Sequence, residues 1–454
     1  MSKLGIIAEY CPLHNGHIFH LQQSKNKTSC QNVICAMSGN FTQRGDIAVL
    51  NKYTRAKHAL LAGADIVVEI PTIFVLSPAE LYAKGAINTL KTFGIDYLAF
   101  GSELGDIDVL KNINTLIKNN KDTLDTLLKQ NLKNGNCYPK SVADALQSLC
   151  ENCFNSGDSG KNDVASNLKN FSDSDTASVA QKIKNECRKN DVITNLKNND
   201  NCKNDVATNL QNNECCKNDV ESNLKNLNIS DIFSLPNNIL ALEYLKNLDN
   251  ITPIAIKREG NYNSLATDLP FASASAIRQC KTNNTLDTIK DKMPQYSFCD
   301  LQQNSVNYEK LFALLSYKLA TTSPTQLANI FDVLEGIENR FIACSSTSAT
   351  YDEFLRQVKT KRYTMSKIKR IALNILLDNY KKTHTLPINY VNVLAVKRSK
   401  LDLLSCFNCN VITKPSDIQK FNLSNPSLQI DLLANALYNI LATDKITNPS
   451  MLIL

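Results

Sequence analysis

Three features are missing from the sequence, and each absence removes a class of protein. No apolar run within the 454 residues approaches the length of a membrane span, which argues against a transmembrane protein. The opening stretch MSKLGIIAE has a short apolar run that Glu9 interrupts and no signal-peptide cleavage pattern, so we expect a cytoplasmic protein that binds no membrane. A P-loop is also missing, because Asn155 stands in NSGDSGK where that motif needs glycine.

Cysteine is present, but not in a pattern that indicates disulfides or a metal. The 15 cysteines are scattered through a long chain without a secretory signal, which favours reduced thiols. Two CxxC pairs, Cys150 with Cys153 and Cys406 with Cys409, lie too far apart in sequence for a usual zinc ribbon. We therefore expect ordinary thiols and no bound metal.

Positive charge is concentrated in one segment. Net charge is only +7, yet KTKRYTMSKIKR at 359–370 lies in a clearly basic stretch of the C-terminal region. Such a segment indicates a polyanionic partner, and its candidate contacts to nucleic-acid phosphates are Lys361, Arg362, Lys369 and Arg370. The alternative is a solvated, charged helix face.

The chain is long enough for two domains, and its middle changes character. A 14-residue unit recurs between about 155 and 230, as in KNDVASNLKN and KNDVITNLKN. Each unit has too few apolar residues to form a buried face, which predicts a disordered insertion in a surface loop. We predict a first domain over 1–285, interrupted by this insertion, and a mostly helical, basic, nucleic-acid-binding domain over 286–454.

The N-terminal part alternates strand and helix patterns. Short apolar runs at 4–8, 32–37, 65–70, 97–100 and 253–256 predict strands, and amphipathic stretches at 17–25, 51–62 and 78–93 predict helices. This alternation predicts an α/β fold with a Rossmann-like parallel sheet. From about 305 onward the patterns are mainly helical, at 308–320, 352–358, 364–380 and 430–442.

Histidine is scarce, but three of the five lie within EYCPLHNGHIFH. This stretch follows the first predicted strand, where ligands bind in parallel sheets, and a helix is expected to begin near Asn15 or Gly16. His14 and His17 are about one turn apart beside the helix N-terminus, an anion site, so both can face the same phosphate. His20 alone is better explained as a polar-pocket residue.

The HNGH stretch resembles the HxGH signature of nucleotidyltransferases. Further stretches, in order, are similar to the bacterial tRNA(Met) cytidine acetate ligase family over the whole chain apart from the repeat: EYCPLHNGH, MSGNFTQRGDIAVLNKYTRAKHAL, GADIVVEIP, FGSELGD, PNNILALEYLK, FASASAIR and KTKRYT. The resemblance implies an ATP-dependent ligase. Acetate would attack the α-phosphate of ATP, giving acetyl-adenylate, and the acetyl group would pass to N4 of the wobble cytidine of elongator tRNA(Met).

The same resemblance implies which residues bind ATP. It also implies that ATP is bound as a substrate together with Mg²⁺. Catalysis falls to His14 and His17. The ATP-binding residues carried over by motif are Ile7, Ala8, Glu9, Tyr10, Cys11, Pro12, Leu13, His14, Asn15, Gly16, His17, Ile18, Phe19, His20, Gly101, Asn237 and Arg258. Asn238 is an open alternative to its neighbour Asn237.

The residues themselves support one of these positions, Gly101, and add a further group of candidates in SASAIR. Gly101 follows an apolar strand, where a missing Cβ lets a ligand approach, although a plain turn would also explain it. In SASAIR, Ser273 and Ser275 at a helix start and Arg278 one turn later suit the β- and γ-phosphates, and an ordinary N-cap with a solvated arginine is the alternative. Arg44 in TQRGD is a further candidate for the same face.

Two other functions stay open at this point. The HxGH motif alone would also allow a small-molecule adenylyltransferase or cytidylyltransferase, which has little need for the basic segment. An RNA-binding protein with a vestigial nucleotide site is the other alternative, and the intact His14, His17 and SASAIR argue against it.

Overall fold

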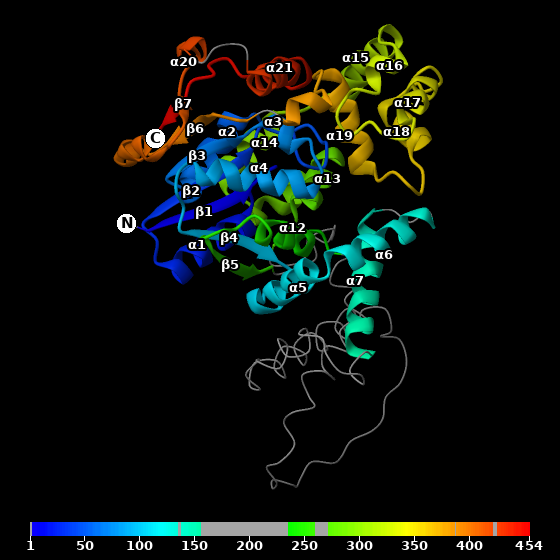
Figure 1. The fold of residues 1–454 in the computed structure, drawn as a ribbon. Helices are drawn as coiled ribbons and strands as arrows, with labels where there is room; N and C mark the ends of the chain where they lie inside the picture. The colour runs from blue at the N-terminus through cyan, green and yellow to red at the C-terminus, as the bar shows by residue number, and fades with distance from the viewer. Residues whose placement is uncertain (1, 135–137, 156–234, 259–270, 386, 421–424) are drawn as a thin grey trace, which may run out of the picture. The chain divides into compact units, whose positions relative to one another are not determined.

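The computed structural model describes residues 2–134, 138–155, 235–258, 271–385, 387–420 and 425–454 (Figure 1). These residues divide into two compact units, residues 1–115 with 235–454 and residues 116–234. The described part of the second unit contains α6 (Lys121–Lys133) and α7 (Tyr138–Asn155), and the Asn131 side chain donates to the Ser141 carbonyl at 3.2 Å. The predicted repeat insertion at about 155–230 lies almost entirely outside the described residues.

Within the described residues, eight strands of the first unit form one sheet. Its order is β5-β4-β1-β2-β3-β6-β7, with β8 paired to β6. The first five strands are parallel, whereas β6 runs antiparallel to β3. The strands are β1 (Lys3–Ala8), β2 (Asn32–Ser38), β3 (Ile66–Ile70), β4 (Tyr97–Ser102), β5 (Thr252–Lys257), β6 (Tyr390–Val396), β7 (Asn410–Ile412) and β8 (Leu452–Ile453).

Helices cover both faces of the sheet. Because side chains alternate along a strand, neighbouring residues of β1 contact helices on opposite faces. Leu4 and Ile6 of β1 belong to the core cluster that also includes side chains of α1 (Asn15–Thr28) and α2 (Lys52–Ala62). Gly5, between them, faces the other side, where a Cβ would lie 3.0 Å from Leu90 of α4 (Ala79–Lys91). The sheet is therefore an α/β layer structure with buried central strands.

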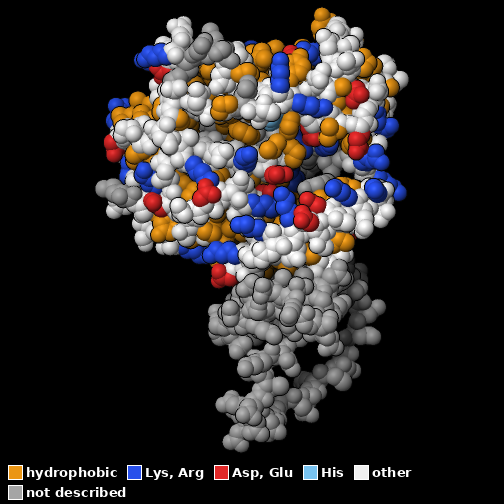
Figure 2. Space-filling model, viewed as in Figure 1, with side chains coloured by type: hydrophobic (Ala, Val, Ile, Leu, Met, Phe, Trp, Pro, Cys, Tyr) orange, Lys and Arg blue, Asp and Glu red, His pale blue; other side chains and the backbone are white. Residues whose placement is uncertain are grey.

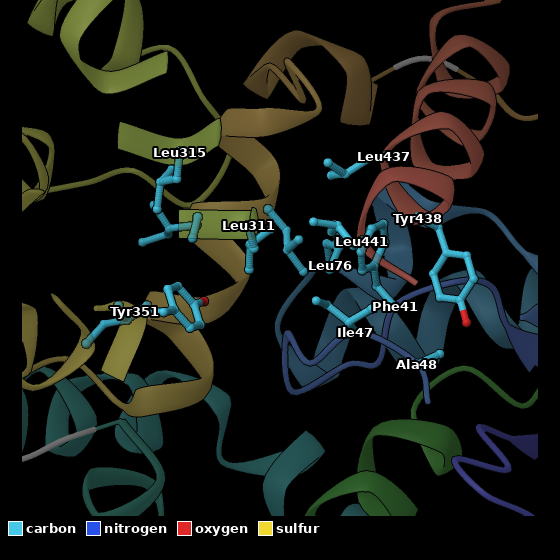
Figure 3. Packing of buried hydrophobic residues seen from close by; sticks show 14 of the residues in the cluster. Phe41, Ile47, Ala48, Leu76, Leu311, Leu315, Tyr351, Leu437, Tyr438 and Leu441 are labelled. Atoms are coloured by element: carbon cyan, nitrogen blue, oxygen red, sulfur yellow. The ribbon is translucent and has the colours of Figure 1, made fainter. Parts of the chain in front are cut away.

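The remaining elements of the first unit are mostly helical and join a second core. Phe41, Ile47 and Leu76 from the N-terminal part pack there with Leu311 and Leu441 from the C-terminal part (Figure 3). The other helices are α3 (Thr72–Val75), α5 (Ile107–Asn119), which runs into the second unit, α12 (Pro236–Leu245), α13 (Ala274–Thr282), η1 (Leu286–Lys292), α14 (Gln295–Gln303), α15 (Tyr308–Thr321), α16 (Pro324–Leu327), α17 (Ile337–Ser345), α18 (Tyr351–Val358), α19 (Met365–Leu376), η2 (Lys381–Thr385), η3 (Arg398–Cys406), α20 (Pro415–Lys420) and α21 (Pro426–Leu441).

The predicted α/β fold is confirmed, and the five predicted strands coincide with β1 to β5 within a few residues. The prediction missed β6 to β8, which come from the mostly helical part and extend the same sheet. The division at residue 285 stays a prediction, and residues on both sides of it lie in the same compact unit. No helix in the described ranges is long and apolar enough to cross a membrane.

Candidate active site

The turn between β1 and α1 carries the histidine motif. The helix begins at Asn15, as predicted, and His14 is its N-cap residue. Gly16 lets the His14 ring lie close to the backbone, because a Cβ at this position would be 3.1 Å from the ring and would press it aside. The first N–H groups of a helix have no acceptor within the helix, so this end presents donors and a positive dipole. The spacing His-x-Gly-His is thus explained by the local packing of the turn.

The rings of His14 and His17 lie together, as predicted from their spacing. They stack with centroids 3.7 Å apart, and Tyr10 meets His17 edge-on at 4.9 Å. The backbone N–H of His14 donates to Nδ1 of His17 at 3.3 Å. Since Nδ1 accepts, a neutral His17 carries its proton on Nε2, which leaves Nε2–H as a donor.

All three histidines are held neutral. Burial, with the positive charges of Arg258 and Arg278, lowers the pKa of His14 from 6.5 to about 3. Burial and the charge of Arg258 lower the pKa of His20 to about 4, and the pKa of His17 lies well below its ordinary value, mainly through burial. Neutral imidazoles can stand beside arginines without repulsion, so the site combines fixed positive charge with uncharged donors.

Gly101 and Arg258 meet at the carboxyl ends of β4 and β5. The Arg258 N–H donates to the Ser102 carbonyl at 3.0 Å, continuing the ladder of the two strands. A Cβ on Gly101 would lie 3.2 Å from Cγ of Arg258, so the missing side chain gives the arginine its space. The structure therefore brings these two predicted ATP-binding residues together, and the charge of Arg258 acts on all three histidines.

The neighbouring asparagines at the start of α12 differ in their surroundings. Asn238 is buried, and its side-chain oxygen accepts from the Ser102 hydroxyl at 2.7 Å and from the Leu104 N–H at 3.2 Å. Asn237 is partly exposed and donates to a carboxylate oxygen of Glu103 at 2.5 Å. Asn238 thus has a structural role at the end of β4, and contact of Asn237 with ATP stays a prediction.

Arg278 reaches the histidine turn from α13, 267 residues along the chain. One of its nitrogens donates to the Cys11 carbonyl at 2.8 Å, and the other lies 3.3 Å from the Ser275 hydroxyl. Ser273 caps α13 by accepting from the Ala276 N–H. The solvated arginine considered from sequence is therefore wrong, while phosphate binding by these residues stays a prediction.

Glu9 and Arg44 form another part of this edge. The Glu9 carboxylate accepts from the Gln43 N–H at 2.7 Å. Burial raises the pKa of Glu9, whereas that hydrogen bond and the charges of Arg278, Arg44 and Arg55 act in the opposite direction. Arg44 therefore lies near the end of β1, as the sequence suggested.

The four basic residues proposed for tRNA do not share one setting. Lys361 and Arg362 are exposed, and Arg362 pairs with Glu335 at 3.2 Å. Lys369 pairs with Asp46 at 2.7 Å, and Arg370 is only 7% exposed. Figure 2 shows Lys and Arg side chains over many parts of the visible face with Asp and Glu among them, so a tRNA surface has to be argued from individual residues.

Sequence reasoning missed two residues that shape the site. Arg55 is fully buried in α2 and donates to the carbonyls of Glu9, Ser38 and Gly39, which joins the ends of β1 and β2. Its signal was a charged residue among small apolar ones on the inner face of the helix. Ser297 of α14 donates to the Leu13 carbonyl at 2.8 Å, and no local pattern marks it.

Potential metal ligands do not cluster among the described side chains. No group of three or more His, Cys, Asp or Glu residues there could hold a metal ion. Cys406 and Cys409 are free thiols, and the side chains of Cys150 and Cys153 lie outside the described residues. Mg²⁺ as a companion of ATP stays a prediction.

Comparisons with known proteins agree with one another. The model of the HIGH Nucleotidyl Transferase family matches residues 1–176 and 173–451. A tRNA(Met) cytidine acetate ligase of Caldicellulosiruptor saccharolyticus is 32% identical over 96% of this chain and 94% of its own, and one of Clostridium perfringens is 32% identical over 99% and 96%. Two crystal structures of Thermotoga maritima TmcAL cover both chains fully: the apo form has a TM-score of 0.76 at 24% identity, and the form bound with alpha-thio ATP has 0.73 at 25%.

Proposed function

This chain belongs to the HIGH nucleotidyl transferase family and, within it, to the tRNA(Met) cytidine acetate ligases, and we propose that it acetylates elongator tRNA(Met) in two steps, the first of which consumes ATP. The observation that carries this proposal is the convergence of His14, His17, Arg258 and Arg278 at the N-terminus of α1. The named relatives act on tRNA(Met), and a solved relative carries alpha-thio ATP.

In the first step, a carboxylate oxygen of acetate attacks the α-phosphorus of ATP. The bond from that phosphorus to the bridging oxygen breaks, and pyrophosphate leaves with the bonding electrons. The products are acetyl-adenylate and pyrophosphate. The chain has little covalent work to do in such a transfer, so its contribution is to orient the reactants and to stabilise charge.

The site residues suit this electrostatic role. We assign Nε2–H of His17, the donors at the start of α1 and the charge of Arg258 to the phosphates of ATP. Arg278, through its contact to the Cys11 carbonyl, fixes the turn and adds positive charge. Donors held in place before the reaction need no reorganisation when charge develops on the phosphoryl oxygens.

In the second step, N4 of the wobble cytidine attacks the acetyl carbonyl and AMP leaves. N4 loses a proton, and the cytidine becomes N4-acetylcytidine. For the tRNA phosphates, the exposed Lys361 and Arg362 are the favoured candidates of the four proposed residues. We place this reaction in the cytoplasm, where the tRNA is found.

The test is acetate-dependent exchange of labelled pyrophosphate into ATP. The change His17→Ala removes one preorganised donor, which typically costs about 3 to 4 kcal/mol in the transition state, so exchange should slow by roughly two to three orders of magnitude. His14→Ala should slow it less, and both variants should keep wild-type circular dichroism.

The second readout is the nucleoside content of tRNA from a strain that lacks this protein. Loss of N4-acetylcytidine supports the ligase. Unchanged N4-acetylcytidine, with exchange that does not depend on acetate, would instead favour a small-molecule nucleotidyltransferase.

A further inference from the structure

The loop that follows β2, residues 39–51, is held by the C-terminal half of the chain. Its apolar side chains Phe41 and Ile47 (Figure 3), together with Leu50, are buried in the core shared with α15, α18, α19 and α21. Asn40 donates to Asn435 of α21 at 2.8 Å, and Asn51 to Asp444 at 2.8 Å. Residues more than 250 positions away in the sequence therefore contribute to holding this loop in place.

Helix α19 contacts the tip of the loop through two charged side chains. Lys369 pairs with Asp46 at 2.7 Å, and a guanidinium nitrogen of Arg370 donates to the Gln43 carbonyl at 3.2 Å. The backbone of the loop also lies close to that of α19, because a Cβ on Gly45 would be 2.6 Å from the backbone nitrogen of Arg370. Arg370 is anchored in turn by Asp332, 3.6 Å away.

The other side of the same loop faces the nucleotide end of the sheet. The peptide N–H of Gln43 donates to Glu9 at 2.7 Å, while the carbonyl of Gln43 accepts from Arg370. The next residue, Arg44, acts electrostatically on Glu9. One residue of the loop thus separates α19 from the end of β1.

We propose that Lys369 and Arg370 are positioning residues for adenylate formation and not contacts to tRNA. They hold the 39–51 loop so that Gln43 fixes Glu9 and Arg44 lies beside the turn that carries the histidines. This inference rests on the proposed function. It also explains why two basic residues of α19 are turned inward while Lys361 and Arg362 of the same segment are exposed.

The decisive variant is Lys369→Met, which keeps the length of the side chain and removes its charge. Loss of this ion pair loosens the tip of the loop at Asp46 while its other contacts remain. We therefore expect the KM for ATP in pyrophosphate exchange to rise and kcat/KM to fall about tenfold to a hundredfold, the range that small misplacements cause. Affinity for tRNA should stay within about twofold of wild type, since no phosphate contact is lost. A smaller fraction of folded enzyme would lower the rate without raising KM.

Four further variants separate positioning from general damage. Asp46→Asn should have the effect of Lys369→Met, and the double variant should lose no more than either single one, because both changes break the same ion pair. Lys369→Arg should retain activity. The matched control is Lys318→Met, which breaks an ion pair of 2.8 Å to Asp378 away from this loop and should leave exchange unchanged.

Failure of the positioning role and failure of the proposed ligase reaction give different results in these assays. If Lys369→Met exchanged pyrophosphate normally but bound tRNA more weakly, Lys369 would be a tRNA contact and the inference would be overturned. Additive losses in the double variant would overturn it as well. If wild-type exchange did not depend on acetate, the proposed function would fail, while calorimetric affinity for ATP in the same variants would still test the positioning.

Discussion

Acidification should destabilise this protein through its buried histidines, and His14 allows the size of the effect to be calculated. The pKa of His14 is lowered from 6.5 to about 3, and its residue is only 4% exposed. Below about pH 6.5 the unfolded chain binds a proton at this position that the folded chain rejects. The free energy of unfolding therefore falls with decreasing pH, starting near 6.5 and levelling off below about 3.

The magnitude follows from the distance between the pH and the pKa of the unfolded state. At about pH 5, that distance is about 1.5 pH units, and each unit is worth about 1.4 kcal/mol. His14 should thus cost about 2 kcal/mol at pH 5 relative to about pH 7.5. The other two histidines of the motif have lowered pKa values as well and should add to the loss.

The assay is urea denaturation followed by circular dichroism at the two pH values, with wild type and His14→Gln in parallel. Glutamine does not titrate, so the pH-dependent loss of unfolding free energy should be about 2 kcal/mol smaller in the variant. An equal loss in both proteins would mean that the folded state accepts a proton on His14, and the account of neutral donors beside Arg258 and Arg278 would be refuted.

Two other substitutions test the site and its support. Gly101→Val places a side chain against Arg258, since even a Cβ at position 101 would lie 3.2 Å from Cγ of the arginine. Affinity for ATP, measured by calorimetry, should therefore fall about tenfold, or about 1.4 kcal/mol. Unchanged affinity would mean that neither residue belongs to the ATP site. Lys52→Met removes the cationic partner of the buried Glu69 carboxylate, 2.6 Å away, and leaves the Asn392 amide as a neutral donor. The uncompensated charge should lower the free energy of unfolding by about 3 to 5 kcal/mol. A loss below about 1 kcal/mol in urea denaturation would contradict this, since that is the range of exposed pairs.

Much of the fold was readable from local patterns. The continuous apolar runs that became β2 and β3 are typical of strands buried on both faces, and the start of α1 followed from the turn before it. Strand β6 was missed although YVNVLAV is equally apolar. The segments on either side of it in the sequence are helical. Its strand conformation depends on hydrogen bonds to β3, a partner far away in the sequence.

The residues 9–20 alone determined the core of the candidate site. The packing of two histidines around Gly16 is local, so spacing along the chain was enough to predict that both rings lie together at the helix start. The same holds for the Ser273 cap of α13. Interactions within one turn of backbone depend on sequence spacing, which a single chain displays directly.

Tertiary structure decided what surrounds that core. Arg278 reaches the Cys11 carbonyl from 267 positions away, and Arg370 is buried against the 39–51 loop instead of facing solvent. A basic run in the sequence shows charge but not which side of its helix is covered, because covering depends on elements that arrive from elsewhere in the chain. The sequence therefore specified the donors of the site, and the fold determined which charges stand beside them.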